Sequence, residues 1–301
     1  MAEPSQLEAK SKRGKPTPGL YLVATPIGNL SDITLRALAV LEAADLIACE
    51  DTRVTRKLLT HHGIAAGRRL RTYNQHVAGK ERDRLLSFCR DGGAVALVCD
   101  AGAPLISDPG LPLLRAAAEL AIPVTSLPGP SAPLAALQLS GLPTLPFYCA
   151  GFLPAKASQR RREIARLAPL AATLVLFEAP HRVASCLADL AQGLGHRPAA
   201  LVREITKRFE EVRRGDLAEL AQGALAVPPK GEIVLVVGPA GAREEGFGDS
   251  ELKARLREAL EAYSLRDAVA RVAAASGEPR RRVYRLALDL EKGALEKSDG
   301  Q

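Results

Sequence analysis

The chain has 301 residues, of which 47% are hydrophobic and 25% are charged, and its formal net charge is +7. This length is enough for two domains with separate cores, and the composition is ordinary for a globular protein. No run of about 18 apolar residues occurs, so we predict no membrane span. Residues 1–18 are polar and lysine-rich, which excludes a secretory signal and predicts a disordered tail.

The charge and cysteine content narrow the class of protein further. The 41 lysines and arginines exceed the 34 acidic residues only mildly, so a polyanionic partner is permitted but not required. The five cysteines are scattered and mostly lie in apolar runs. We therefore predict buried, reduced thiols in a cytoplasmic protein, without disulfides or a metal site.

The first half of the chain repeats a strand–turn–helix pattern. Short apolar runs at residues 20–24, 45–49, 94–99 and 122–127 predict buried strands, with helical patterns between them. Such a repeat predicts a mainly parallel sheet covered on both faces, which we assign to a domain at residues 19–130. We expect Ser31 or Asp32 to cap the first helix.

Polar and glycine-rich or proline-rich segments follow these strands, where open α/β sheets bind ligands. Pro26 and Gly28 shape the first turn, residues 50–53 are all polar, and the loop at 100–110 is rich in glycine and proline. None of these segments matches a dinucleotide-binding or P-loop pattern. The alternative interpretation is a set of structural connections with helix-capping aspartates.

The second half predicts another α/β domain, at residues 131–240. Proline and glycine are dense at 128–154, which we interpret as a hinge. Strands are predicted at 173–177, 199–204 and 232–237, with helices near 159–167 and 182–194.

Beyond a glycine-rich linker at 239–249, three short helices predict a C-terminal domain at 250–293. Ser264 opens a capping box for the second helix. Arginines cover the outer faces, so a helix–turn–helix with a basic face would contact nucleic acid, whereas the alternative is a solvated helical hairpin. The apolar positions expected to pack together are Leu252, Leu256, Val269, Val272, Val283 and Leu286.

Several motifs, in this order, closely resemble those of the bacterial 16S ribosomal RNA (cytidine-2′-O)-methyltransferases, a branch of the tetrapyrrole-methylase superfamily. The resemblance covers about residues 19–238, and the C-terminal helices also resemble the appended domain of that family. The motifs lie at residues 20–30, 32–36, 50–53, 100–110, 127–132, 140–143, 151–154, 180–182, 203–207 and 231–232. The family usually has threonine where Ala103 stands.

The resemblance implies a two-domain, tetrapyrrole-methylase-like α/β fold with a cofactor cleft between the domains, plus the small helical domain. It implies S-adenosylmethionine as the cofactor and a homodimer. It also implies 2′-O-methylation of the ribose of a cytidine in the decoding region of 16S rRNA, within the small ribosomal subunit. The alternatives are a methyltransferase of the same fold for a tetrapyrrole or other small substrate, and a ribosome-binding protein without catalysis.

The resemblance and the loop chemistry together predict the site residues. Glycine and proline loops let backbone approach a ligand closely. The residues expected to bind the cofactor are Pro26, Asp100, Ala101, Gly102, Ile106, Ser131, Ala132, Phe177 and Glu178. A general base would activate the ribose hydroxyl, and the candidates are Glu50, Asp51, Asp100, Glu178 and His181.

Basic side chains are expected to meet RNA phosphates. The arginine run at 160–162 is the clearest basic cluster before the C-terminal helices, although such runs are often solvated helix faces. The residues predicted to bind RNA are Arg53, Arg160, Arg161, Arg182, Lys207, Arg280, Arg281 and Arg282.

Overall fold

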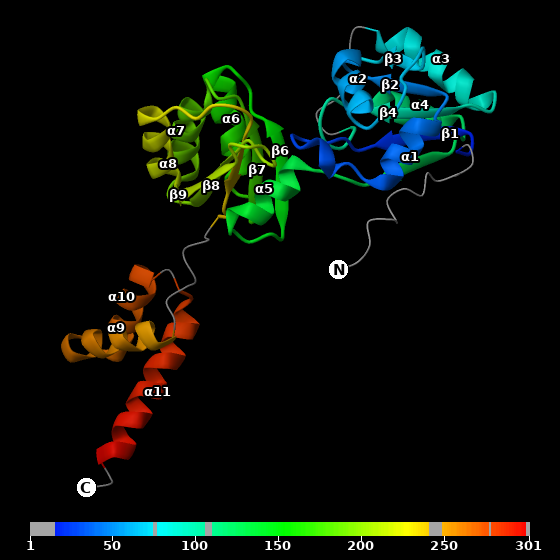
Figure 1. Cartoon of the computed structure of the whole chain (residues 1–301). Helices are drawn as coiled ribbons and strands as arrows, with labels where there is room; N and C mark the ends of the chain where they lie inside the picture. The colour runs from blue at the N-terminus through cyan, green and yellow to red at the C-terminus, as the bar shows by residue number, and fades with distance from the viewer. Residues whose placement is uncertain (1–15, 75–76, 106–109, 241–248, 277, 299–301) are drawn as a thin grey trace, which may run out of the picture. The chain divides into compact units, whose positions relative to one another are not determined.

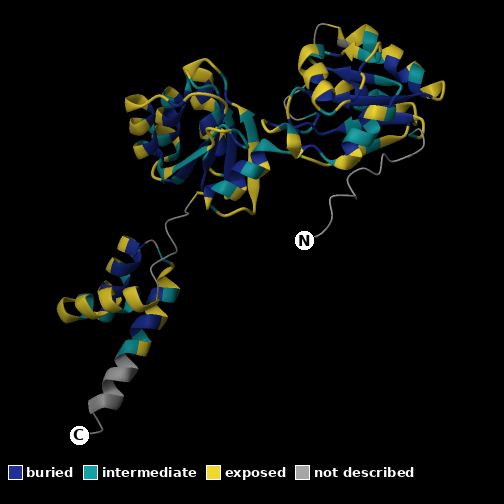
Figure 2. Ribbon diagram, viewed as in Figure 1, coloured by how far each residue is buried: buried dark blue, intermediate teal, exposed yellow. Residues whose placement is uncertain are grey.

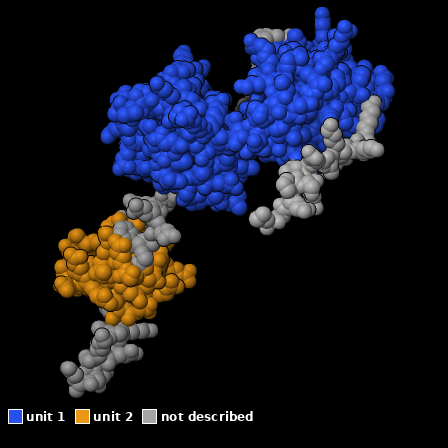
Figure 3. Space-filling view, viewed as in Figure 1, with its two compact units in different colours: residues 1–239 blue, residues 240–301 orange. Residues whose placement is uncertain are grey.

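The computed structural model describes residues 16–74, 77–105, 110–240, 249–276 and 278–298. It divides into two compact units, residues 1–239 and 240–301 (Figure 3). Most of the predicted N-terminal tail, together with Ile106 in the loop at 100–110, lies outside the described residues. None of the described helices is long and apolar enough to cross a membrane.

The N-terminal part of the first unit is built on a parallel sheet, as predicted. Its strands run in the order β3-β2-β4-β1-β5, and every pairing is parallel. These strands are β1 (Gly19–Val23), β2 (Leu46–Cys49), β3 (Leu70–Thr72), β4 (Ala94–Val98) and β5 (Val124–Leu127). The helices between them are α1 (Leu35–Ala43), α2 (Thr52–His61), α3 (Ala78–Arg90) and α4 (Leu111–Glu119), and a short 3-10 turn, η2 (Leu30–Asp32), precedes α1.

Helices cover both faces of this sheet because its strands are apolar on both sides. Val23 and Val98 pack with α1 and α2 on one face. Leu20 and Val95 pack with α3 and α4 on the other face. Figure 2 shows the central strands largely in the colour of buried residues. This three-layer arrangement brings the carboxyl ends of the strands to one edge of the sheet.

The C-terminal part of the first unit holds a second sheet of mixed direction. Its strands run in the order β6-β7-β10-β8-β9, and only β6 and β7 pair in parallel. They are β6 (Phe147–Phe152), β7 (Thr173–Glu178), β8 (Pro198–Arg203), β9 (Glu211–Asp216) and β10 (Ile233–Val237), and the first four are labelled in Figure 1. The helices are α5 (Ala132–Ser140), α6 (Ala157–Leu167), α7 (Val183–Leu194) and α8 (Leu217–Ala226).

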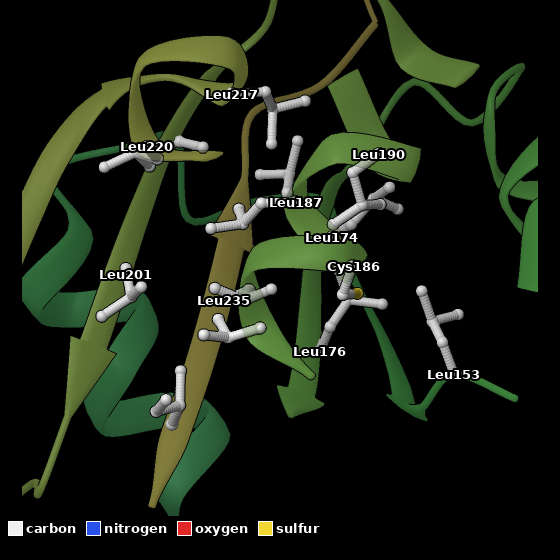
Figure 4. Close-up of a cluster of buried hydrophobic side chains, with 14 of the residues drawn as sticks. Leu153, Leu174, Leu176, Cys186, Leu187, Leu190, Leu201, Leu217, Leu220 and Leu235 are labelled. Carbon is white, nitrogen blue, oxygen red and sulfur yellow. The ribbon is translucent and has the colours of Figure 1, made fainter. Parts of the chain in front are cut away.

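Alternating residues of the second sheet pack against different helices. In Figure 4, Leu187 and Leu190 of α7 lie over Leu174 and Leu235 of the sheet, in the cluster that also takes in α6 and α8. On the opposite face, Val175 and its neighbours pack against α5. The second sheet therefore also lies between two helical layers.

The segment at 128–154, interpreted as a hinge, contains α5 and β6, and its role as a hinge stays a prediction. The predicted cap of the first helix is wrong. Thr34, and neither Ser31 nor Asp32, caps α1: its side chain accepts a hydrogen bond from the Ala37 backbone N–H. Ser31 and Asp32 belong to η2 instead.

All five cysteines have free thiols, and all but Cys149 are buried.

The second unit is a bundle of three helices, α9 (Asp249–Ala262), α10 (Leu265–Ser276) and α11 (Arg280–Ser298). Ser264 precedes α10, and its hydroxyl accepts a hydrogen bond from the Asp267 N–H and donates one to the Asp267 carboxylate. The predicted apolar positions are all buried in one cluster: Leu252, Leu256, Val269, Val272, Val283 and Leu286.

Candidate functional site

A cavity of about 480 Å³ lies where segments of the two sheets of the first unit meet. Loops that follow β4 and β7 line it, and so do residues at the start of α5 and β10. Its volume is in the range of sites for small ligands and cofactors. We call it the first cavity.

The first cavity brings together most of the predicted site residues, which are far apart in the sequence. Pro26 lines a neighbouring cavity instead, and His181 is exposed and is not part of either lining. The predicted residues that line the first cavity are Glu50, Asp100, Ala101, Gly102, Ser131, Ala132, Phe177 and Glu178. Their roles stay predictions.

Gly102 fixes the shape of the loop after β4. Its φ of 80° lies in the left-handed region that favours glycine. Gly102 and Thr25 exchange two backbone hydrogen bonds, of 2.9 and 3.0 Å. The buried Thr25 hydroxyl also donates to the Cys99 carbonyl, at 3.1 Å. These bonds tie the loop to the end of β1, so backbone of the loop is held at the cavity wall.

Asp100 lies two residues after the end of β4, at the start of this loop. Its carboxylate accepts a hydrogen bond of 3.1 Å from the backbone N–H of Asp51, which follows β2. Burial, and then repulsion from Asp51, raise the pKa of Asp100 above its ordinary value. A desolvated carboxylate of this kind binds a proton more readily than an exposed one.

Glu178, at the end of β7, is almost fully buried and has partners within the protein. Its carboxylate accepts a 2.8 Å hydrogen bond from the Ala179 N–H and lies 3.2 Å from Nε of Arg182. Arg182 in turn donates to the Leu153 carbonyl at 2.8 Å. The Arg182 guanidinium thus stabilises the buried Glu178 and the loop after β6, and its contact with RNA stays a prediction.

The lining of the first cavity has a distinctive charge and shape. Among its described residues are four carboxylates, Glu50, Asp100, Glu178 and Glu232, and neither lysine nor arginine. Apolar side chains form the walls, and the rings of Phe152 and Phe177 lie 5.3 Å apart. The arrangement suits a ligand that carries a positive charge and a flat apolar group.

Sequence reasoning missed several of these lining residues. Phe152 lies on β6, which was not predicted as a strand. Glu232 lies in the motif at 231–232, and Val234 lies in a segment predicted as a strand, but neither was predicted to bind the cofactor. Only the pairing of β10 with β7 and β8 brings this segment to the cavity.

The predicted RNA contact of Arg160 is corrected. Arg160 is only 5% exposed, and its guanidinium donates to the Asp189 carboxylate at 2.7 Å. Arg161, which is largely exposed, binds the other oxygen of Asp189 at 2.8 Å. Arg160 therefore joins α6 to α7 inside the second core, out of reach of a phosphate.

The remaining predicted RNA residues lie at the surface, several of them in ion pairs. Arg53 pairs with Asp51 at 2.6 Å, and Lys207 pairs with Glu204 and Glu232. In the second unit, Arg282 pairs with Asp249 and Glu278, both at 2.8 Å, whereas Arg280 and Arg281 are exposed. Within the described ranges, His, Cys, Asp and Glu side chains form no group of three that could hold a metal ion.

Comparison with known proteins places the chain in a family. Residues 19–221 match the tetrapyrrole (corrin/porphyrin) methylases, and residues 248–291 match the RsmI C-terminal HTH domain. The chain is 48% identical over 286 residues to the ribosomal RNA small subunit methyltransferase I of Mesorhizobium japonicum, covering 94% of this chain and 96% of the relative. The protein of the same name from Erythrobacter litoralis is 47% identical over 275 residues, with coverages of 91% and 96%.

Solved structures show the same fold. The uroporphyrin-III C-methyltransferase of Thermus thermophilus aligns with a TM-score of 0.52 at 25% identity, covering 73% of this chain and 94% of that chain. A cobalt precorrin-4 methyltransferase aligns with a TM-score of 0.54 at 16% identity and the same coverages. The chain therefore belongs to the ribosomal RNA small subunit methyltransferase I family, a branch of the tetrapyrrole methylases.

Proposed function

We propose that this protein transfers a methyl group from S-adenosylmethionine to the 2′-hydroxyl of a cytidine ribose in the decoding region of 16S rRNA. The observation that carries the proposal is the lining of the first cavity, acidic and apolar without lysine or arginine, in a chain of the methyltransferase I family. The relatives are named as methyltransferases of small-subunit ribosomal RNA.

The residues of the first cavity fit this cofactor. Its sulfonium is a cation, which the carboxylates at the cavity wall favour. Its adenine is a flat aromatic ring system, whose faces suit apolar walls such as Ile27, Phe177 and Val234. The two backbone hydrogen bonds between Thr25 and Gly102 hold this loop, and with it the backbone of Ala101, at the cavity wall. When bound, the cofactor supplies the electrophilic methyl carbon, and the protein has to position the reactants and exclude water.

Among the candidate bases, we propose Asp100. Its raised pKa favours uptake of the proton from the ribose hydroxyl, and its position between two cavities allows contact with both reactants. Glu178 is less suited because Arg182 already neutralises it. Asp51 is also less suited: hydrogen bonds from the Arg53 side chain and backbone lower its pKa to about 2.

Two other functions were open from the sequence. A methyltransferase for a tetrapyrrole or other small substrate has no need of a C-terminal helix–turn–helix unit, and the match of residues 248–291 to such a domain favours RNA. A ribosome-binding protein without catalysis has no need of a cofactor cavity. We also propose the homodimer that the resemblance implies, which analytical ultracentrifugation of the purified chain can check.

Two measurements test the proposed function. Calorimetry with the purified chain should show binding of S-adenosylmethionine that persists in the presence of a chelator. Mass spectrometry of 16S rRNA nucleosides from cells that lack this protein should show the loss of one 2′-O-methylated cytidine. If the cofactor does not bind, or if the methylated nucleoside is still present, the proposed function is wrong.

A further inference from the structure

A second cavity, of about 400 Å³, adjoins the first. Besides the shared residues, helix α2 contributes Val54, Thr55, Lys57 and Leu58. Lys207, which follows β8, also lines this cavity. The residues that line both cavities are Ile27, Cys99, Asp100, Ala101 and Glu232. A molecule in the second cavity would therefore reach the wall of the first at Asp100 and Ala101.

A third, more open hollow continues from the second cavity along α2. Leu30 and Lys57 line both, so the two spaces are neighbours. The described lining of the third hollow contains several basic residues but neither aspartate nor glutamate. The full lining is Leu30, Arg53, Arg56, Lys57, Thr60 and His61.

Charge thus changes sign along one path on the surface of the first unit. The first cavity has four carboxylates and no lysine or arginine in its described lining, the second has two acidic and two basic residues, and the third is basic. A cationic ligand is favoured at one end of this path and a polyanion at the other.

The basic residues of α2 lie outside its buried face. Thr55, Leu58 and Leu59 form the buried face of this helix, while Arg56 and Lys57 are exposed. Arg53 is held by Asp51, but neither Arg56 nor Lys57 forms an ion pair with any described residue. A merely solvated helix face usually mixes both signs of charge, whereas this face is basic and opens into a cavity.

We propose that the second cavity holds the ribose of the acceptor nucleotide and that Arg56 and Lys57 bind an adjoining phosphodiester of the same RNA strand. This inference rests on the proposed function. The 2′-hydroxyl would face Asp100, where the two cavities meet, and the strand would continue along the third hollow. Phosphate contacts of this kind fix the position of a nucleic acid without reading its sequence. Lys207, already paired with Glu204 and Glu232, shapes the cavity wall.

The test compares Lys57→Ala with Lys57→Arg, Arg56→Ala and the matched control Lys80→Ala. Lys80 is an exposed lysine on α3 that lines none of the three spaces. The measurements are the KM for small ribosomal subunits that lack the methyl group, RNA-fragment binding by fluorescence anisotropy at several salt concentrations, and cofactor affinity by calorimetry.

We expect Lys57→Ala to raise KM about tenfold and to lower the slope of log affinity against log salt by about one, the change for one lost phosphate contact. Arg56→Ala should have a similar effect, Lys57→Arg should restore most of the binding, and Lys80→Ala should match the wild type. Cofactor affinity should be unchanged in all variants.

Three results would overturn the proposal. KM and salt slopes of Lys57→Ala and Arg56→Ala equal to those of Lys80→Ala would show that neither residue of α2 contacts RNA. Loss of cofactor affinity in Lys57→Ala would assign the second cavity to the cofactor. Weaker binding to the intact subunit, but not to the RNA fragment, would place a ribosomal protein on α2. If the wild type transferred no methyl group, the proposed function would fail, and the anisotropy data alone would still decide whether Lys57 binds RNA.

Discussion

The ionised carboxylate of Asp100, which we propose as the general base, lowers the stability of the folded protein. Its pKa in the folded protein is raised, mainly by burial, so the native state binds this proton more tightly than the unfolded chain does. The free energy of unfolding due to Asp100 therefore falls as the pH rises through the interval between the unfolded and folded pKa values. At neutral pH the ionised carboxylate costs stability.

We therefore predict that Asp100→Asn lowers the rate of methyl transfer by about 10²–10⁴-fold, the usual loss when a general base is removed. The amide oxygen can still accept the Asp51 N–H, so the melting temperature at pH 7 should be equal to or above that of the wild type. The wild-type rate should also fall as the pH is lowered through the raised pKa of Asp100. A folded variant with near-wild-type activity would remove Asp100 from the mechanism.

Arg160 shows how a basic residue can be misassigned from sequence. Burial raises the pKa of Asp189, but hydrogen bonds from Arg161 and Arg160 outweigh it and hold this pKa below its ordinary value. We predict that Arg160→Met lowers the free energy of unfolding by about 3 kcal/mol, because it leaves a buried carboxylate with one partner. Urea denaturation measures this change.

The control for Arg160→Met is Arg161→Ala, at a side chain that is 61% exposed. Exposed ion pairs contribute less than about 1 kcal/mol, so this variant should be nearly as stable as the wild type. If both variants lost the same stability, the assignment of Arg160 to the core would be wrong.

At the scale of helices and strands, the sequence predicts those elements whose burial follows from their own residues. β4 and β10 are continuous apolar runs and are buried throughout, so composition alone identifies them. β9, with the sequence EVRRGD, is a polar edge strand, and β3 is only three residues long. Their strand conformation depends on pairing with β8 and β2, which no local pattern encodes.

The same distinction holds for the candidate site. Gly102 and Asp100 could be predicted because a glycine-rich loop after an apolar strand is a local pattern. The second cavity could not, because it requires the approach of Lys57 on α2 and Lys207 after β8. These two residues are far apart in the chain, and only the fold brings them to one space.

Helix α11 carries two exposed arginines that take no part in the packing of the second unit, so they can be replaced without disturbing its core. Arg280 and Arg281 lie outside the apolar cluster of the second unit, whereas Arg282 holds Asp249 and Glu278. We predict that the double variant Arg280→Ala, Arg281→Ala keeps its fold and its cofactor affinity but weakens RNA binding. Its salt slope should fall by about two, one unit for each phosphate contact.

Circular dichroism of this double variant and RNA binding at several salt concentrations provide the check. Arg282→Ala serves as a comparison, because it should lower the stability of the helical unit by breaking its two ion pairs. RNA affinity and salt slope identical to those of the wild type would show that Arg280 and Arg281 do not contact RNA.

At the scale of the whole molecule, three features stand together. The first unit has a cavity lined by residues that belong to or follow strands of both of its sheets, and an adjoining second cavity that shares residues with a hollow lined by basic residues of α2. The second unit is a helical domain that matches the C-terminal domain of the family. Each is consistent with methyl transfer to a nucleotide in ribosomal RNA.

The most direct test of this central claim is to locate the transferred methyl group. The purified full chain is incubated with small ribosomal subunits that lack the modification and with S-adenosylmethionine carrying an isotopically labelled methyl group, and the digested 16S rRNA is analysed by mass spectrometry. We predict the label on the ribose of a single cytidine, and its absence with Asp100→Asn. Label on a base, label spread over many nucleotides, or no label on the RNA would contradict the account.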